Sequence, residues 1–97
     1  MIEPIVRTMD GVTIYTVDGK KHRTDGGPAE IRPGGYKAWW KDGLRHRTDG
    51  PAIEFRSGTL EWWVDGVEYY DNTDYCKAAG ITIEEMEVLV LKFGDLD

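Results

Sequence analysis

The two histidines of the chain each stand three residues before an aspartate, a spacing that could support chemistry. His22 precedes Asp25, and His46 precedes Asp49. Two imidazoles and two carboxylates could ligate a divalent metal or share a proton in acid–base catalysis. The two pairs occupy equivalent places in successive copies of one motif, however, where each histidine is expected to hydrogen-bond its own turn. Closed zinc sites also need convergent ligands, usually including cysteine. The sequence therefore predicts no metal site and no cofactor.

Other nucleophilic or phosphate-binding patterns are missing from the sequence. The single cysteine, Cys76, is followed by Lys77, and a neighbouring cation can lower the pKa of a thiol. A buried, inert thiol is the simpler interpretation. The sequence contains no Gly-x-Ser-x-Gly elbow, no phosphate-binding glycine loop and no paired-cysteine motif. We therefore predict a protein without enzymatic activity.

Cysteine content and hydropathy predict where the protein resides. One cysteine cannot form an intrachain disulfide, which suits a reducing compartment. The first residues, MIEPIVRTMDGV, include a glutamate and no long apolar run, unlike a signal peptide. No stretch approaches the roughly 20 apolar residues that span a bilayer. These features predict a soluble, cytoplasmic protein that does not associate with membranes.

Acidic residues are concentrated at one end of the chain. The net charge of the 97 residues is −6. Residues 1–60 hold ten Lys or Arg and eight Asp or Glu, a net charge of +2, whereas residues 61–97 hold two Lys and ten Asp or Glu, a net charge of −8. An acidic third argues against wrapping a phosphate backbone and suits a basic protein surface as partner. A solvated surface that maintains solubility is the simpler alternative.

A tandem repeat is the main signal in the sequence. Residues 22–29 read HRTDGGPA, and residues 46–52 read HRTDGPA. Paired tryptophans and Asp-Gly dipeptides recur with spacings of 23 or 24 residues. The pairs are Trp39-Trp40 and Trp62-Trp63, and the dipeptides are Asp18-Gly19, Asp42-Gly43 and Asp65-Gly66.

The repeat predicts a mainly β fold. Aromatic and β-branched residues favour strands, and Asp-Gly pairs favour tight hairpin turns. The links between strands are too short for a crossover helix, so neighbouring strands must be antiparallel. We expect an antiparallel β-meander of tandem repeats of 23 or 24 residues over residues 1–71. The expected strands are residues 3–8, 12–17, 28–32, 36–41, 51–56 and 59–64, with short pieces near 20–22, 44–46 and 67–70.

Two short helices are predicted to cap this meander, within an acidic helical segment over residues 72–97. The first is expected to start at residues 72–74 and to end at Gly80. The second starts with a capping box, in which Thr82 is followed three residues later by Glu85. One face of this second helix is apolar, at helical spacing. That face comprises Met86, Leu89, Val90 and Phe93.

The repeated unit resembles repeats found in proteins of bacteriophages and giant viruses, and is more distantly similar to the short hairpins of MORN repeats. The resemblance covers residues 11–70, with partial copies at residues 18–29 and 62–66. The residues that carry it most fully are Trp39, Trp40, Asp42, Gly43, His46, Arg47, Asp49, Gly50, Pro51 and Ala52. Residues 68–71, EYYD, depart from the pattern, so the array is expected to stop there. The resemblance implies a phage or mobile-element origin and brings no activity with it.

The predicted function is binding to a protein. Adjacent residues of a strand point to opposite faces, so one tryptophan of each pair should face the core and the other the opposite side of the sheet. We expect a small phage accessory protein that docks on a host protein, in one form inhibiting a host-defence enzyme with acidic residues that imitate phosphates. The expected contact residues are Trp39, Trp40, Trp62, Trp63, Glu84, Glu85, Glu87, Asp95 and Asp97.

Two alternative functions remain open from the sequence. A structural module could self-assemble into a homo-oligomer through open edge strands. A nucleic-acid binder could use the basic rows at residues 20–23 and 45–47 together with the tryptophans. Stacking of Arg23 or Arg47 on a tryptophan of the neighbouring repeat is the simpler use of these rows.

Overall fold

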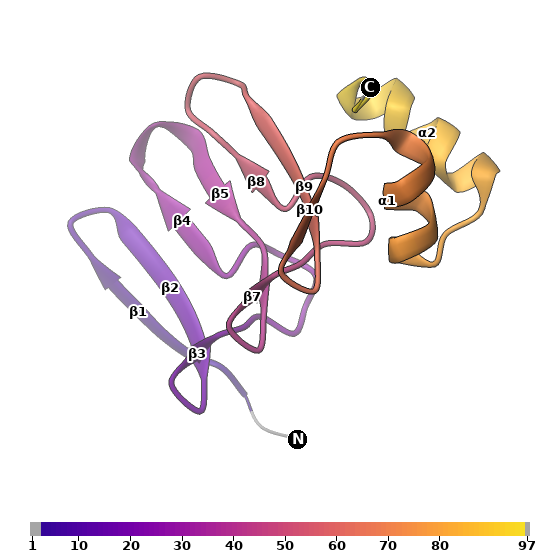
Figure 1. Cartoon of the computed structure of the whole chain (residues 1–97). Helices are drawn as coiled ribbons and strands as arrows, with labels where there is room; N and C mark the ends of the chain where they lie inside the picture. Colours follow the sequence, from indigo (N-terminus) through magenta and orange to yellow (C-terminus); the bar gives the residue numbers. More distant parts are fainter. Residues whose placement is uncertain (1–2, 97) are drawn as a thin grey trace.

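The computed structural model describes residues 3–96. Strands linked by tight turns occupy residues 5–69, and two helices follow them (Figure 1). The strands are β1 (Ile5–Met9), β2 (Val12–Val17), β3 (Lys20–Lys21), β4 (Glu30–Arg32), β5 (Tyr36–Ala38), β6 (Trp40–Lys41), β7 (Leu44–Arg45), β8 (Ile53–Glu54), β9 (Leu60–Val64) and β10 (Val67–Tyr69). The helices are α1 (Asn72–Ala79) and α2 (Ile83–Phe93), and a short 3-10 turn, η1 (Pro33–Gly35), links β4 to β5.

The strands form the antiparallel meander that the sequence predicts. The main sheet has the order β1-β2-β4-β5-β8-β9-β10, with β3 paired to β2, while β6 and β7 form a separate hairpin. The strand expected at residues 36–41 is divided at Trp39. Its amide donates to the carbonyl of Ala52 (2.7 Å), but its carbonyl accepts from the amide of His46 (3.1 Å). The chain therefore changes pairing partner at Trp39 and leaves the main sheet.

Three short hairpins are built on Asp-Gly turns: β2–β3 and β9–β10, which are part of the main sheet, and β6–β7, which is separate from it. Asp42 and Asp65 have φ of 51° and 50°, and the glycines that follow them are also in the left-handed region. Two successive positive φ values define a type I′ turn, whose twist matches the flanking strands. The amide of Gly43 donates to the carbonyl of Lys21 (3.0 Å), and the amide of Gly66 donates to that of Arg45 (2.9 Å). Each turn is thereby attached to the preceding hairpin.

Both helices begin and end close to where the sequence predicts. The cap of α1 is Asp71, one residue before the expected start, and its carboxylate accepts from the amide of Asp74 (2.8 Å). Gly80, with φ of 69°, ends α1. The capping box at the start of α2 is present in both directions, between Thr82 and Glu85. Neither helix is long and apolar enough to cross a membrane.

The main core lies where the helices pack on the end of the sheet. Residues from β9, α1 and α2 meet there and are almost fully buried: Trp62, Val64, Tyr75, Met86 and Leu89. Val90 and Phe93 pack against this cluster, so the apolar face predicted for the second helix is confirmed. The helices α1 and α2 cover the β9–β10 end of the sheet, and β1 lies at the opposite end (Figure 1).

Candidate protein-binding surface

The paired tryptophans point to opposite faces of the sheet, and only one member of each pair is buried. Trp39 and Trp62 are 9% and 5% exposed, whereas Trp40 and Trp63 are half-buried on the other face. The strand alternation that we predicted explains this arrangement. Burial removes Trp39 and Trp62 from the set of expected partner contacts, because a partner can reach little of either side chain.

The more accessible tryptophans are already engaged within the molecule. The guanidinium group of Arg45 lies between them, 5.3 Å from the ring centroid of Trp40 and 4.9 Å from that of Trp63. The indole nitrogens donate to carboxylates, from Trp40 to Glu30 (3.2 Å) and from Trp63 to Glu61 (3.0 Å). These contacts occupy the ring faces and the polar edge, so the aromatic stripe is part of the protein's own packing.

We expected each histidine to hydrogen-bond its own turn, and this prediction is wrong, because both histidines connect successive hairpins. Nδ1 of His22 accepts a hydrogen bond from the amide of Asp42, and Nδ1 of His46 accepts one from the amide of Asp65, both at 3.0 Å. An imidazole nitrogen that accepts from an amide carries no proton of its own. Within residues 3–96 no group of three potential ligands gathers around a metal-sized site. The histidines are structural links in this fold.

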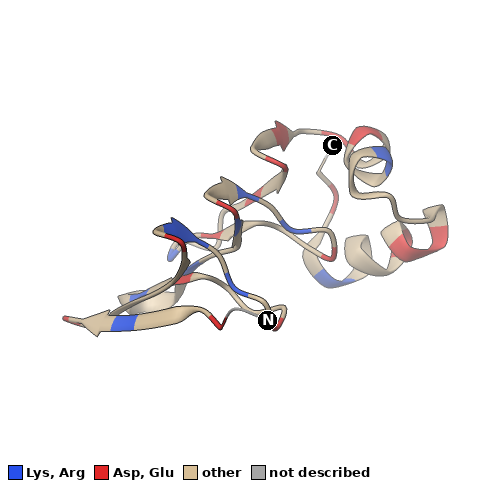
Figure 2. Cartoon of the chain, turned by 90° about the horizontal axis from the view of Figure 1, so that it is seen from below, with Lys and Arg blue, Asp and Glu red and all other residues tan. Residues whose placement is uncertain are grey.

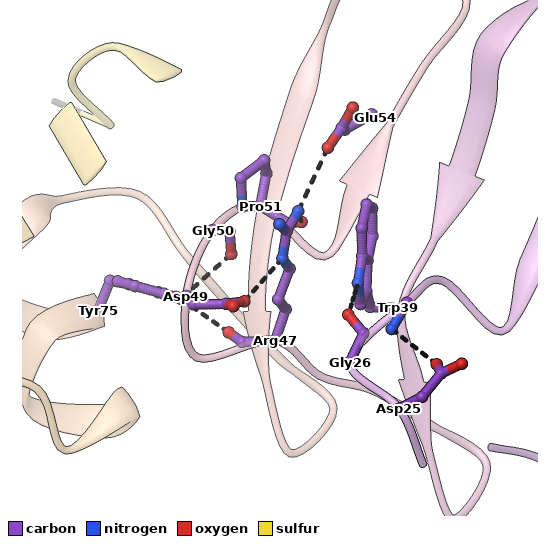
Figure 3. A network of polar contacts seen from close by, with 10 residues as sticks. Asp25, Gly26, Trp39, Arg47, Asp49, Gly50, Pro51, Glu54 and Tyr75 are labelled. Carbon is purple, nitrogen blue, oxygen red and sulfur yellow. Dashed lines mark hydrogen bonds and ion pairs between the residues drawn. The ribbon is translucent and has the colours of Figure 1, made fainter. Parts of the chain in front are cut away.

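The arginines of the repeated motif bind its aspartates and carbonyls (Figure 3). The side chain of Arg47 donates to Asp49 (2.9 Å), to the carbonyl of Pro51 (3.1 Å) and to Glu54 (3.2 Å). Its guanidinium carbon also lies 3.8 Å from the ring centroid of Trp39, which belongs to the same repeat and not to the neighbouring one that we predicted.

Arg23 makes the equivalent contacts one motif earlier. It pairs with Asp25, and their hydrogen bond lowers the pKa of the Asp25 carboxyl. Its guanidinium carbon lies 4.1 Å from the ring centroid of Tyr15, again in the same repeat. These two arginines are therefore committed to internal contacts, which leaves the basic rows few charges to offer a phosphate backbone.

Among the expected acidic contacts, two carboxylates stabilise the fold. Within the capping box Glu85 accepts from the amide of Thr82, and this hydrogen bond, followed by the contact with the Thr82 side chain, lowers the pKa of Glu85. Asp95 accepts from the side-chain amide of Asn72 (2.8 Å). Asp97 lies outside the described residues.

The other two expected acids are exposed and available. Glu84 and Glu87 are exposed on α2 and make no ion pair or side-chain hydrogen bond with any residue between 3 and 96. Figure 2 shows acidic segments and a few basic ones on the helices, while acidic and basic residues alternate along the strands. Three of the ten acidic residues of the C-terminal third lie on α2.

A groove between α1 and α2 is a feature that we did not predict. Its volume is about 870 Å³. Most of the exposed surface of its lining is apolar, and the lining residues are Asn72, Thr73, Cys76, Lys77, Ile81, Thr82, Ile83, Met86, Glu87, Val90, Leu91 and Asp95. Two of the apolar side chains are unusually exposed, Ile83 at 72% and Leu91 at 87%. We call this feature the helical groove.

The sequence contained a signal for the helical groove. Seven of the eleven residues of α2 are apolar, whereas a helix that covers a core with one stripe needs about half. The predicted face accounts for Met86, Leu89, Val90 and Phe93, which leaves three apolar residues without a place in the core. Those three are Ile83, Val88 and Leu91, and all are exposed. A helix with apolar residues beyond its core face indicates a second contact surface.

Comparisons with protein-family models, curated proteins and solved structures found no match for this chain.

Proposed function

We propose that this chain is a small, non-enzymatic protein-binding module that uses its helical groove to bind a basic, partly apolar segment of another protein. The observation that carries the proposal is the pair of exposed apolar residues, Ile83 and Leu91, in a groove bordered by Glu87 and Asp95. Isolated exposed apolar residues are common on protein surfaces, but a group of them beside a groove favours a binding surface.

The shape and charge of the helical groove favour a particular kind of partner. Its volume of about 870 Å³ falls among those of known ligand-binding clefts, commonly about 300–1,000 Å³. An amphipathic helix could place its apolar side chains between α1 and α2, as in helix-in-groove complexes. Lysine or arginine residues flanking that apolar stripe would face Glu87 at the edge of the groove and the exposed Glu84, three residues earlier on α2. The expected partner segment is therefore an amphipathic basic helix.

The sheet is a weaker candidate for the binding surface. The rings of Trp40 and Trp63 are occupied by Arg45, and Arg23 and Arg47 are paired with carboxylates. Internal pairing of these groups also disfavours binding to nucleic acids. In the form of the proposal that the sequence resemblance favours, the partner is a protein of the bacterial host of a phage. The acidic residues of α2 then imitate phosphates.

The proposal is tested by affinity capture from a bacterial lysate followed by titration of the purified captured protein. One variant carries Leu91→Lys, and a second carries Glu84→Lys together with Glu87→Lys. Leu44→Lys is the matched control, because Leu44 is an exposed leucine on β7, 48% exposed. We expect both groove variants to capture much less of the partner and to bind it more weakly in titration, and the control to match the wild type.

The salt dependence of binding provides an independent readout. Charged contacts at an exposed rim weaken as ionic strength rises, so the titrated affinity should fall with added salt. The double-lysine variant should show a smaller salt dependence than the wild type. A partner retained by Leu91→Lys would contradict the proposal and move the binding surface to the sheet.

A further inference from the structure

Strand β1 forms an open end of the main sheet. It pairs with β2 along its whole length, from Ile5 opposite Thr16 to Met9 opposite Val12, and with no other strand of the described chain. All five of its residues are exposed. At the other end of the sheet, β10 is only three residues long and α1 packs against it. The sheet thus has one long uncovered edge (Figure 1).

The main-chain groups that point outward from β1 can be identified from the register. The amide of Tyr15 donates to the carbonyl of Ala29 (2.8 Å), on the side of β2 that faces away from β1. Val6 lies opposite Tyr15. In an antiparallel pair, residues opposite each other turn their main-chain groups either both inward or both outward. The amide and carbonyl of Val6, and of Thr8 two residues later, therefore point away from β2.

The side chains of β1 also suit contact with another strand. Ile5 and Met9 lie on one face and are 56% and 75% exposed, and Val6 lies on the other face and is 51% exposed. Natural edge strands are usually blocked by lysine, proline or a bulge. Strand β1 contains no lysine and no proline, its pairing with β2 is regular, and Arg7 is its single charged residue. Such an edge can accept a further strand.

We infer that a second copy of this chain covers the edge, with its own β1 pairing antiparallel to the first. Two copies with a net charge of −6 repel each other least where the negative charge is smallest. The acidic helices lie at the far end of the sheet, so contact through β1 keeps them apart. A two-fold axis uses the same surface on both copies and consumes the single long edge of each. Association therefore stops at a dimer with one continuous sheet.

The outward groups restrict the register of this pairing. Val6 and Thr8 must face outward groups of the other strand. Placing Val6 opposite Thr8 of the second copy sets the two Arg7 side chains directly across from each other, which is destabilising. Placing Val6 opposite Val6 of the second copy sets Arg7 opposite Ile5, with Glu3 and Arg7 of the second copy at the two diagonal positions instead of Arg7 directly across. Thr8 then lies opposite Pro4, whose carbonyl can accept from the Thr8 amide although proline has no amide hydrogen to donate in return. We therefore assign the two-fold axis to Val6.

This dimer goes beyond the proposed function, and it does not depend on it. The helices α1 and α2, whose residues line the helical groove, lie at the end of the molecule away from β1 (Figure 1), so the groove stays uncovered in both copies. A dimer would carry two such grooves, one at each end of the continuous sheet. If the helical groove binds a partner, two linked sites raise the apparent affinity for a partner that presents two segments.

The test is sedimentation equilibrium of the full chain over a wide concentration range, comparing the wild type with Val6→Lys. Val67→Lys is the matched control, since Val67 is an exposed valine of β10, 53% exposed. We expect the wild type and Val67→Lys to reach twice the mass of the chain. The dissociation constant of Val6→Lys should rise by roughly tenfold or more, because the axis places two lysines opposite each other.

Residue-resolved amide exchange separates loss of the dimer from loss of the fold. With rising concentration of the wild type, exchange at the amides of Val6 and Thr8 should slow, while that of Tyr15 stays unchanged. A wild type that remains monomeric throughout, or a dimer unaffected by Val6→Lys, would overturn the inference. So would a dimer in which the amides of Val6 and Thr8 exchange as fast as in the monomer. Because none of these readouts involves the helical groove, they are independent of partner binding.

Discussion

The hydroxyl group of Tyr75 lies 3.1 Å from the carbonyl oxygen of Gly50, to which it donates a hydrogen bond (Figure 3). The equivalent carbonyl in the preceding motif, that of Gly26, accepts from the indole nitrogen of Trp39 (3.0 Å). Tyr75 of α1 thus provides the donor that Trp39, between β5 and β6, provides one motif earlier. The same hydroxyl lies 2.7 Å from the carbonyl oxygen of Arg47. Tyr75 therefore attaches α1 to the loop before β8.

Replacing Tyr75 with phenylalanine should destabilise the protein. The ring would still fill the core, but the carbonyls of Arg47 and Gly50 would lose a buried donor. We expect Tyr75→Phe to lower the free energy of unfolding by about 1–3 kcal/mol, measured by denaturant titration. Tyr70→Phe is the control, because Tyr70 is 72% exposed and its change should stay within about 0.5 kcal/mol. Equal stabilities of Tyr75→Phe and the wild type would contradict this account.

The stability of the wild type should fall at alkaline pH because of Tyr75. Burial raises the pKa of Tyr75 to about 12, compared with about 10 for an exposed tyrosine. A group whose pKa is raised on folding contributes stability that is complete below its unfolded pKa and is lost as pH rises through its folded pKa. The difference in unfolding free energy between the wild type and Tyr75→Phe should thus be constant up to about pH 10 and decrease towards about pH 12. A difference unchanged over that interval would refute the prediction.

Acid should destabilise the protein through Glu30. This carboxylate is 4% exposed and contacts Lys21, Arg32 and Trp40. Burial by itself raises the pKa of Glu30, but the hydrogen bonds and charges of Arg32 and Lys21 together hold it below its usual value. Its stabilising contribution is therefore complete above the unfolded pKa of about 4.3 and is lost as pH falls through the folded pKa.

A glutamine at this position should isolate that contribution. Glu30→Gln should lower the free energy of unfolding at neutral pH by about 1.5–3 kcal/mol, the range for hydrogen bonds to charged groups. The difference from the wild type should shrink below about pH 4.3. Denaturant titrations between neutral and acidic pH would measure it, with the exposed Glu84→Gln as control. A difference that is independent of pH would exclude the ionic contribution.

Arg45 should stabilise the protein by its stacking between two indole rings. Arg45→Ala should lower the free energy of unfolding by about 1–2 kcal/mol, since each cation–π contact contributes about 0.5–1 kcal/mol or more when partly desolvated. Arg45→Lys should recover only part of the loss, because an ammonium group cannot stack on two rings as a planar guanidinium does. Tryptophan fluorescence should shift in both variants as Trp40 and Trp63 become more hydrated. Full recovery with lysine would show that charge alone is sufficient.

Local features of this fold could be predicted from the sequence because they depend on neighbouring residues. The aspartates of the Asp-Gly turns adopt positive φ, as at Asp18 with 52°, and the strands between them follow from turn spacing. The capping box of Thr82 and Glu85 determines where α2 begins. In each case a residue type and a short distance along the chain determine the backbone conformation.

Contacts between hairpins could not be predicted in the same way. Nothing in the sequence states that His46 bonds the amide of Asp65, 19 residues later, instead of its own turn. The sandwich of Arg45 between Trp40 and Trp63 depends on the offset between successive hairpins. Side-chain partners of this kind depend on packing in three dimensions. The helical groove likewise depends on how α1 and α2 pack against each other.

The histidine links have a consequence for how such a protein can change in size. Each link joins one hairpin to the turn of the next, as His22 joins Asp42 and His46 joins Asp65. Each such contact involves only two adjacent hairpins and does not depend on how many hairpins the chain contains. Duplication of one 23- or 24-residue segment of the gene would lengthen the molecule without altering either terminus. A change in the number of repeats would thus set the distance between β1 and the two helices.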